Sequence, residues 1–72
     1  MKGDFFYKRL GERVSFERKK RGFSQDELSG IAELDRTYLA RIEEGKANPS
    51  MRILHKIARK LKVKINYLLT GV

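Results

Sequence analysis

Residues 24–50, SQDELSGIAELDRTYLARIEEGKANPS, contain two short stretches with helical spacing and a very short connection between them. The first helix is expected over 25–32 and the second over 36–44. Ser24 and Asp35 immediately precede them. Serine and aspartate are preferred at these positions, because their side-chain oxygens accept hydrogen bonds from the free amides of the first turn. The stretch therefore predicts two helices joined by a three-residue turn.

A three-residue turn between two short helices is typical of a helix-turn-helix, in which the second helix is presented outward. Leu34 is the apolar residue of this turn and should fill the angle between the helices. On a wheel of about 100° per residue, Leu39 and Ile42 mark the inward side of the second helix, whereas Thr37 and Arg41 lie opposite. Many helical hairpins share this pattern, so the spacing indicates the motif without establishing it.

Two further helices are expected at about 5–21 and 51–61, because apolar residues recur there with helical spacing. A short fifth helix is expected at about 65–69, before Thr70 and Gly71. No segment alternates apolar and polar residues over a useful length, as a strand would. The fold class is therefore all-α, a compact five-helix domain that covers residues 1–72. The side chains expected in its core are Phe6, Leu10, Val14, Leu28, Ile31, Ala32, Leu39, Ile42, Met51, Leu54, Ile57, Ala58 and Leu61.

The composition excludes several classes of function. The 72 residues include no cysteine and one histidine, so a disulfide framework, a tetrahedral zinc site and a His-based triad lack their residues. No apolar run approaches the roughly 18 residues of a membrane helix, and the first eight residues do not form a signal peptide. The formal net charge of +8 favours a polyanionic partner. We expect a cytoplasmic, non-enzymatic protein without metal or cofactor.

The positive charge is unevenly distributed along the chain. Residues 1–22 carry eight basic and three acidic side chains, residues 23–45 carry two and six, and residues 46–72 carry seven and none. If the middle segment contacts bases, the flanking segments must supply most phosphate contacts, which position a protein on DNA without specifying sequence. A solvated basic surface explains the same distribution equally well from charge alone.

A long ordered run of residues makes the motif more specific. From Gln25 to Ser29, from Leu34 to Lys46 and from Asn48 to Ser50, the chain resembles the phage-repressor and Cro-like helix-turn-helix family, also called the xenobiotic-response-element type. The resemblance spans roughly residues 10 to 71. It implies a lambda-repressor-like fold and sequence-specific binding of double-stranded DNA to regulate transcription. It also implies that a homodimer binds a palindromic operator.

Some positions depart from the family pattern. Glu33 replaces a usual glycine in a turn that tends to need a left-handed residue, which costs a non-glycine residue about 1 kcal/mol. Ser29 replaces a usual alanine where two helices touch, and Gly30 weakens its helix by about 1 kcal/mol relative to alanine. Lys62 and Lys64 replace a common glycine and a common capping serine. These departures affect local stability more than function.

The second helix supplies the candidates for contacts with base edges: Arg36, Thr37 and Arg41. Arg36 lies in the first turn, the end that usually enters the major groove. An arginine can donate paired hydrogen bonds to O6 and N7 of guanine. The resemblance implies contacts with the DNA backbone elsewhere, although each residue could instead be solvated and Tyr38 could pack on the neighbouring helix. The candidates for these contacts are Gln25, Tyr38, Lys46, Asn48 and Arg52.

Two charged residues are expected to be structural. Arg18 continues the apolar stripe of the first helix, and Glu43 lies near Leu39 on the inward side of its helix. The family pairs these positions, so the resemblance implies a partly buried ion pair.

Four apolar residues fit the predicted core poorly: Phe5, Phe16, Ile53 and Tyr67. They are either absorbed into a small core or form a self-association surface. The resemblance favours the region of the last two helices for a dimer. Two other functions remain open, an antitoxin or bridging module that holds a protein partner, and a controller regulator of a restriction–modification system. No membrane partner is expected.

Overall fold

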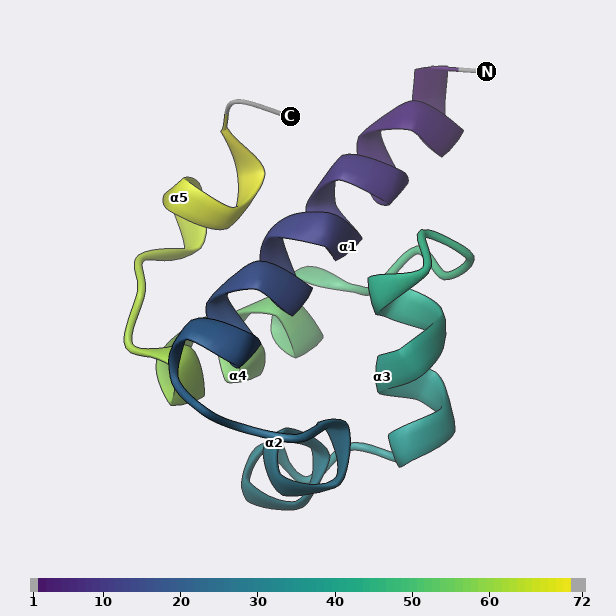
Figure 1. Cartoon of the computed structure of the whole chain (residues 1–72). Coiled ribbons are helices and arrows are strands. Elements are labelled where there is room, and N and C mark those ends of the chain that lie inside the picture. Colours follow the sequence, from purple (N-terminus) through teal and green to yellow (C-terminus); the bar gives the residue numbers. More distant parts are fainter. Residues whose placement is uncertain (1, 71–72) are drawn as a thin grey trace.

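The computed structural model describes residues 2–70, with side chains described from Phe5 onward, and these residues form five helices without a strand (Figure 1). The all-α prediction is therefore confirmed. The first helix begins at Lys2 rather than Phe5, and the third ends at Glu43, one residue earlier than expected. The helices are α1 (Lys2–Lys20), α2 (Gln25–Ala32), α3 (Arg36–Glu43), α4 (Met51–Leu61) and α5 (Ile65–Leu69).

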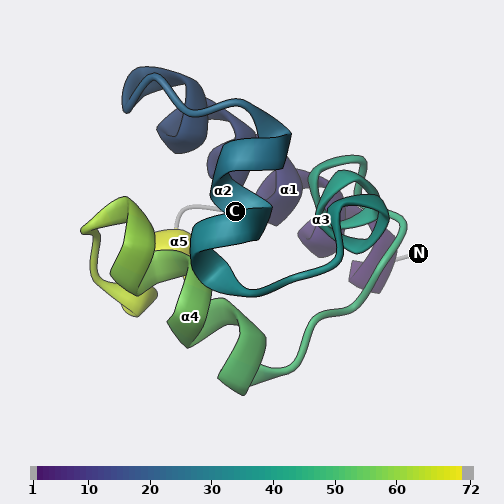
Figure 2. The same cartoon turned by 90° about the horizontal axis from the view of Figure 1, so that it is seen from below.

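The long helix α1 organises the molecule, because α3, α4 and α5 all pack against it. In Figure 1, α3 and α5 lie on opposite sides of α1, and Figure 2 shows the same separation from below. Helix α2 packs against both α3 and α4. Helix α3 is therefore supported from behind by α1 and from one side by α2, which leaves its remaining face open.

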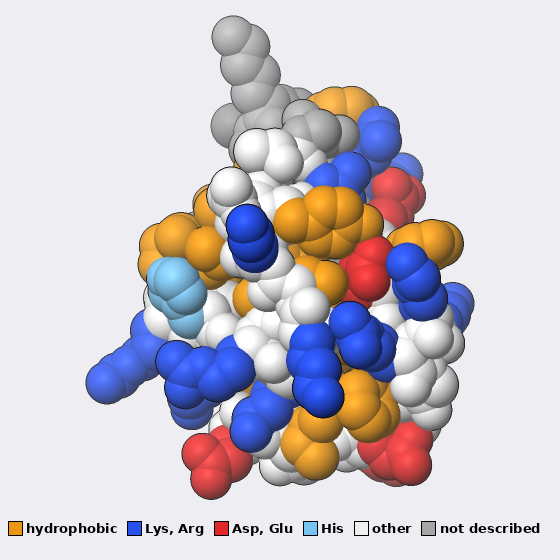
Figure 3. Space-filling model, turned by 90° about the vertical axis from the view of Figure 1, so that its left-hand side faces the viewer, with side chains coloured by type: hydrophobic (Ala, Val, Ile, Leu, Met, Phe, Trp, Pro, Cys, Tyr) orange, Lys and Arg blue, Asp and Glu red, His pale blue; other side chains and the backbone are white. Residues whose placement is uncertain are grey.

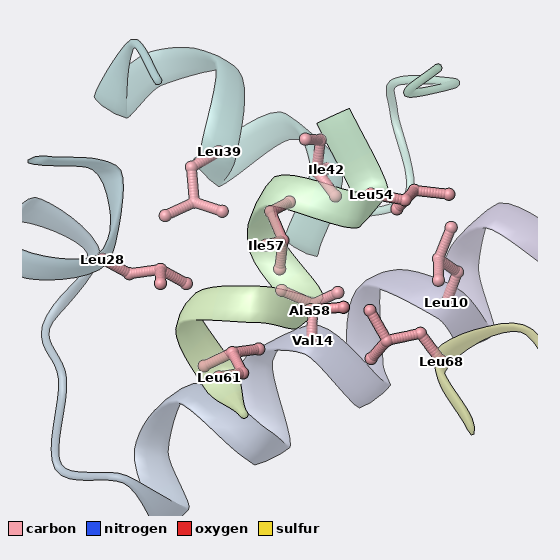
Figure 4. Close-up of a cluster of buried hydrophobic side chains, with 10 residues drawn as sticks. All are labelled: Leu10, Val14, Leu28, Leu39, Ile42, Leu54, Ile57, Ala58, Leu61 and Leu68. Carbon is pink, nitrogen blue, oxygen red and sulfur yellow. The ribbon is translucent and has the colours of Figure 1, made fainter. Parts of the chain in front are cut away.

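All five helices contribute to one apolar core (Figure 4). Two residues predicted to lie in the core are exposed, and one buried residue was not predicted. Ile31 is 42% exposed, because the buried side of α2 is centred between Leu28 and Ser29 and Ile31 lies about 100° away. Met51 is 51% exposed at the first position of α4, beyond the edge of the cluster. Leu68 is fully buried, but α5 is too short for periodicity to identify it. The buried cluster consists of Leu10, Val14, Leu28, Leu39, Ile42, Leu54, Ile57, Ala58, Leu61 and Leu68.

The N-caps predicted at Ser24 and Asp35 are present, and Ser50 caps α4 in the same way. Ser24 and Glu27 form a capping box, in which the Ser24 Oγ accepts from the Glu27 amide at 3.0 Å and Glu27 Oε1 accepts from the Ser24 amide at 2.8 Å. Asp35 and Ser50 each accept a hydrogen bond of 3.2 Å from the amide three residues later. Lys64 precedes α5 without a side-chain cap. The start of α3 is therefore fixed by a local interaction that the sequence encodes.

The turn between α2 and α3 contains the left-handed residue that the family pattern predicts. Glu33 has φ 58° and ψ 46°, and its amide donates to the carbonyl groups of Ser29 and Gly30. Lys62, which also replaces a common glycine, has φ 59° at the end of α4. A side chain with a Cβ is strained in this region, so both positions reduce stability.

Replacing Glu33 with glycine is expected to raise the free energy of unfolding by about 0.5–1 kcal/mol. Glycine removes the steric cost of the left-handed conformation, although it loses more backbone entropy on folding. Urea denaturation followed by circular dichroism measures the change. Glu33→Ala is the matched control, because it removes the same side chain but keeps the Cβ. Equal stabilities of the two variants would contradict this origin of the strain.

The four apolar residues that fitted the predicted core poorly differ in their environments. Phe5 and Phe16 are 58% and 61% exposed, so they are not absorbed into the core, whereas Ile53 packs against it. Tyr67 is 39% exposed, but its hydroxyl donates a hydrogen bond of 2.7 Å to Oε2 of Glu17, which is buried. This hydrogen bond, together with desolvation, raises the pKa of Tyr67, and the nearby Arg13 opposes the effect. Tyr67 thus fastens α5 to α1.

Candidate nucleic-acid interface

Helix α3 separates its apolar and polar residues on two opposite sides. Leu39 and Ile42 are 0% and 1% exposed and point into the core. Arg36, Thr37 and Arg41 are all exposed. The structure therefore leaves all three candidates for base contacts accessible, with Thr37 and Arg41 opposite the apolar side and Arg36 on the flank next to α2.

Arg36 makes a specific contact with α2. Its Nε lies 2.8 Å from Oδ1 of Asp26, and both side chains are largely exposed, at 63% and 77%. Asp26 is the second residue of α2, and Arg36 is the first residue of α3. The ion pair therefore joins the first turns of the two helices of the motif at the surface.

Arg41 is tied to the loop that follows α3. Its Nη2 donates to the carbonyl group of Lys46 at 3.0 Å, and the Lys46 amide donates to the carbonyl group of Arg41 at 2.9 Å. Gly45 has φ +77°, and a Cβ there would lie 2.6 Å from the Cα of Lys8 on α1. The loop is thus held between α1 and the end of α3. The Lys46 ammonium group remains exposed, 3.9 Å from Glu44.

The candidates for backbone contacts fall into two groups. Lys46, Asn48 and Arg52 are exposed. Tyr38 is half-buried and packs against the core, and Gln25 is half-buried with its Nε2 donating to Glu43 at 3.0 Å. Gln25 is therefore partly engaged within the protein, which sequence reasoning missed because nothing local relates residues eighteen positions apart.

Arg18 and Glu43 form a buried, bidentate ion pair. The Arg18 Nε lies 2.7 Å from Oε2 and its Nη2 lies 3.0 Å from Oε1, and the two side chains are 10% and 6% exposed. The remaining Arg18 Nη1 donates to the carbonyl group of Phe23 at 2.7 Å. Including Gln25, this network connects α1, α3, the loop before α2 and the first turn of α2. It fixes the orientation of the two motif helices relative to α1.

Much of the positive charge lies away from α3. Figure 3 shows the side of the molecule on which α5 lies in Figure 1, where basic side chains gather with hydrophobic patches between them. Lys20, Arg21 and Lys64 line a shallow hollow beside Tyr67. Because α5 and α3 lie on opposite sides of α1, these cations are not part of the surface that α3 presents. The solvated-surface interpretation therefore fits this part of the charge.

Within the described residues, no group of three or more His, Cys, Asp or Glu side chains is arranged to hold a metal ion. None of the five helices in this part of the chain combines the length and apolar character that a membrane crossing needs.

Comparison with known proteins agrees with this architecture. A helix-turn-helix domain model matches residues 11–72, and the chain belongs to this family. It is 37% identical over 57 residues to the immunity repressor of Bacillus phage phi105, covering 79% of this chain and 40% of the repressor. It is 36% identical over 61 residues to the transcriptional regulator SinR of Bacillus subtilis, covering 83% of this chain and 55% of SinR. The resemblance to phage repressors is confirmed, and the chain spans about half the length of such curated relatives.

Solved structures give the same result. The restriction-modification controller protein C.AhdI from Aeromonas hydrophila superposes with a TM-score of 0.84 at 31% identity, covering 86% of this chain and 94% of that chain. SinR in complex with DNA superposes with a TM-score of 0.81 at 36% identity, covering 83% and 97%. SinR also superposes from its complex with SinI, with a TM-score of 0.83 at 35% identity, covering 86% and 61%.

Proposed function

We propose that this protein is a non-enzymatic transcriptional regulator in the cytoplasm that binds double-stranded DNA in a sequence-specific manner. The observation that carries this proposal is the exposed surface of α3, where Thr37 and Arg41 lie opposite a fully buried apolar side and Arg36 is exposed on the flank, in the first turn. According to this proposal, α3 enters the major groove and these three side chains contact base edges. Membership of the helix-turn-helix family and similarity to SinR, which has been crystallised with DNA, support it.

The phosphate contacts come from residues around α3. Lys46, Asn48 and Arg52 are exposed in and after the loop that Arg41 and Gly45 hold in place. Gln25 at the start of α2 contacts phosphate through the second hydrogen of its side-chain amide. The N-terminus of α2 lies at the same place and favours an anion there. Tyr38 contributes through its hydroxyl while its ring packs on the core.

We further propose that residues 1–72 act as one domain and that two copies bind a palindromic operator. A dimer with two-fold symmetry places its two recognition helices about 34 Å apart, one turn of the duplex. The region of α4 and α5 is the dimer surface that the family resemblance favours. Selection of bound duplexes from a random pool tests this, because a dimer yields two inverted half-sites about ten base pairs apart.

Substituting Arg41 and Lys46 separately is expected to distinguish base contacts from phosphate contacts. Arg41→Ala should lower binding to the selected site by about 1–3 kcal/mol and relax the preference at one base pair. Lys46→Ala should weaken binding to all sequences alike and reduce the salt dependence by about one phosphate contact. Affinities for the selected site and for random DNA, measured by fluorescence anisotropy over a salt series, check both results.

The pair of substitutions also tests the role of Arg41 in holding the loop. If Arg41 acted only through its hydrogen bond to Lys46, Arg41→Ala would weaken all sequences alike. A wild-type protein that selects no sequence from the pool would reject the proposed function.

Two narrower roles have specific support. Similarity to C.AhdI over 94% of that chain favours a controller regulator of a restriction–modification system. This role predicts that the selected operator lies beside restriction and modification genes. The complex of SinR with SinI favours a role that includes a protein partner, such as an antitoxin or bridging module. That role predicts that a second protein co-purifies with this chain in a fixed ratio and that its binding releases the DNA.

A further inference from the structure

We propose that Asp26 is a specificity-determining residue that positions the Arg36 guanidinium group for recognition of guanine. This inference rests on the proposed role of Arg36 in DNA binding. Asp26 does not itself contact the base. It acts through Arg36, because Oδ1 of Asp26 lies 2.8 Å from Nε of Arg36.

The carboxylate of Asp26 contributes little to the fold beyond its favourable position at the N-terminal end of the α2 dipole, which is worth about 0.3–1 kcal/mol. Ser24 and Glu27 together cap α2, so Asp26 has no capping role. Its side chain is 77% exposed and that of Arg36 is 63% exposed. Ion pairs with this exposure add little to stability, because water competes for both groups and ordering long side chains costs entropy. The pair therefore matters for what it does to the arginine rather than for folding.

The contact selects one edge of the guanidinium group. Arginine presents its donors in a planar fork, with Nε and one terminal nitrogen on the side and two terminal nitrogens at the end. The Asp26 carboxylate lies beside Nε, next to the side edge. The two terminal nitrogens remain to donate to O6 and N7 of guanine. Asp26 also shifts the rotamers of Arg36 toward this arrangement before DNA arrives, which reduces part of the entropy lost on binding.

The charge of Asp26 acts in the same direction. A carboxylate at the start of α2, on the surface that presents Arg36, repels the DNA backbone regardless of its sequence. It therefore weakens binding to random DNA while it strengthens the correct contact. Both effects increase the ratio between specific and non-specific affinity, which is the quantity that a regulator needs.

The test measures the affinity of the full chain and of four variants for three kinds of DNA. These are the selected operator, the set of operators in which each position is replaced in turn by each of the other bases, and random DNA. Asp26→Asn removes the charge and keeps the size of the side chain. Glu44→Gln is the matched control, because it removes an equal charge beside the Lys46 loop without contact to Arg36. Arg36→Ala identifies the base pair that Arg36 contacts, and Asp26→Glu tests whether a longer carboxylate restores the contact. Thermal unfolding establishes that each variant is folded.

We expect Asp26→Asn to reduce the preference for guanine at the position identified by Arg36→Ala, by about fivefold to tenfold. Its affinity for random DNA should rise about twofold to threefold. Glu44→Gln should give a similar rise with the guanine preference unchanged, and Asp26→Glu should keep most of the preference. This combination supports a positioning role, because a change in net charge alone cannot alter the preference at one base pair.

Two outcomes would overturn the inference while sequence-specific binding of DNA by α3 stands. One is an unchanged guanine preference in Asp26→Asn, with binding to all sequences increased as in Glu44→Gln. The other is an Arg36→Ala variant that retains the preferences of the wild-type protein at all positions. Failure of the wild-type protein to select any operator would reject the proposed function itself and is recognised by the first selection experiment.

Discussion

Replacing Glu43 with glutamine is expected to lower the free energy of unfolding by about 3–5 kcal/mol, because it leaves the buried Arg18 cation without its counter-charge. The two side chains are only 10% and 6% exposed, and two hydrogen bonds of 2.7 and 3.0 Å join them. Charge-assisted, bidentate pairs of this kind are among the stronger side-chain interactions. In a chain of 72 residues, such a loss removes a large part of the total stability.

Urea denaturation measures this loss, and the chain contains a matched control. Arg9 and Glu12 form an ion pair at 3.5 Å with side chains 45% and 57% exposed. Water screens this pair, so Glu12→Gln should change the stability by less than about 1 kcal/mol. The double variant Arg18→Met with Glu43→Leu should be more stable than Glu43→Gln, since no unpaired charge stays buried. Similar losses in Glu43→Gln and Glu12→Gln would contradict the structural role of the buried pair.

Replacing Gly11 with alanine is expected to destabilise the protein by about 2 kcal/mol or more. Gly11 is buried where α1 crosses the end of α3, and a Cβ there would overlap the carbonyl oxygen of Ile42 and lie 2.6 Å from that of Glu43. These atoms belong to the backbone, so the two helices must separate to admit the methyl group. The higher helix propensity of alanine, worth about 1 kcal/mol, offsets only part of this cost.

Gly30→Ala provides the opposite control in the same experiment. Gly30 lies inside α2, and a Cβ there meets no atom within 4 Å. Alanine should therefore stabilise the protein by about 1 kcal/mol through helix propensity alone. Thermal and urea unfolding of both variants should give changes of opposite sign. A stabilising Gly11→Ala would show that α1 and α3 can move apart without loss.

The division of α3 into a buried apolar side and an exposed polar side was predictable, because it depends on local information. The caps at Ser24 and Asp35 and the spacing of Leu39 and Ile42 involve residues within one or two turns of each other. The left-handed conformation at Glu33 also follows from the length of the turn and the family pattern. These features are enough to predict the bounds of α2 and the candidate residues on α3 from the sequence.

The errors at Ile31 and Met51 arise because helical spacing marks every residue near an apolar side. Only the arrangement of the neighbouring helices decides which of these residues lose water. Helix α2 packs on α3 and α4 through Leu28 and Ala32, which leaves Ile31 in solvent. Leu68 shows the converse, since α5 alone carries no periodic signal and is buried by α1 and α4.

By itself, then, the chain specified its helices, their caps, the outward side of α3 and its excess of positive charge, because each arises from residues near one another in the sequence. The tertiary structure decided which polar and charged groups meet: Asp26 with Arg36, Gln25 with Glu43, and Glu17 with Tyr67. It also decided that α1 and α3 approach so closely at Gly11. Such contacts join segments that are distant along the chain, and they exist only after the packing of the core has set the distances between helices.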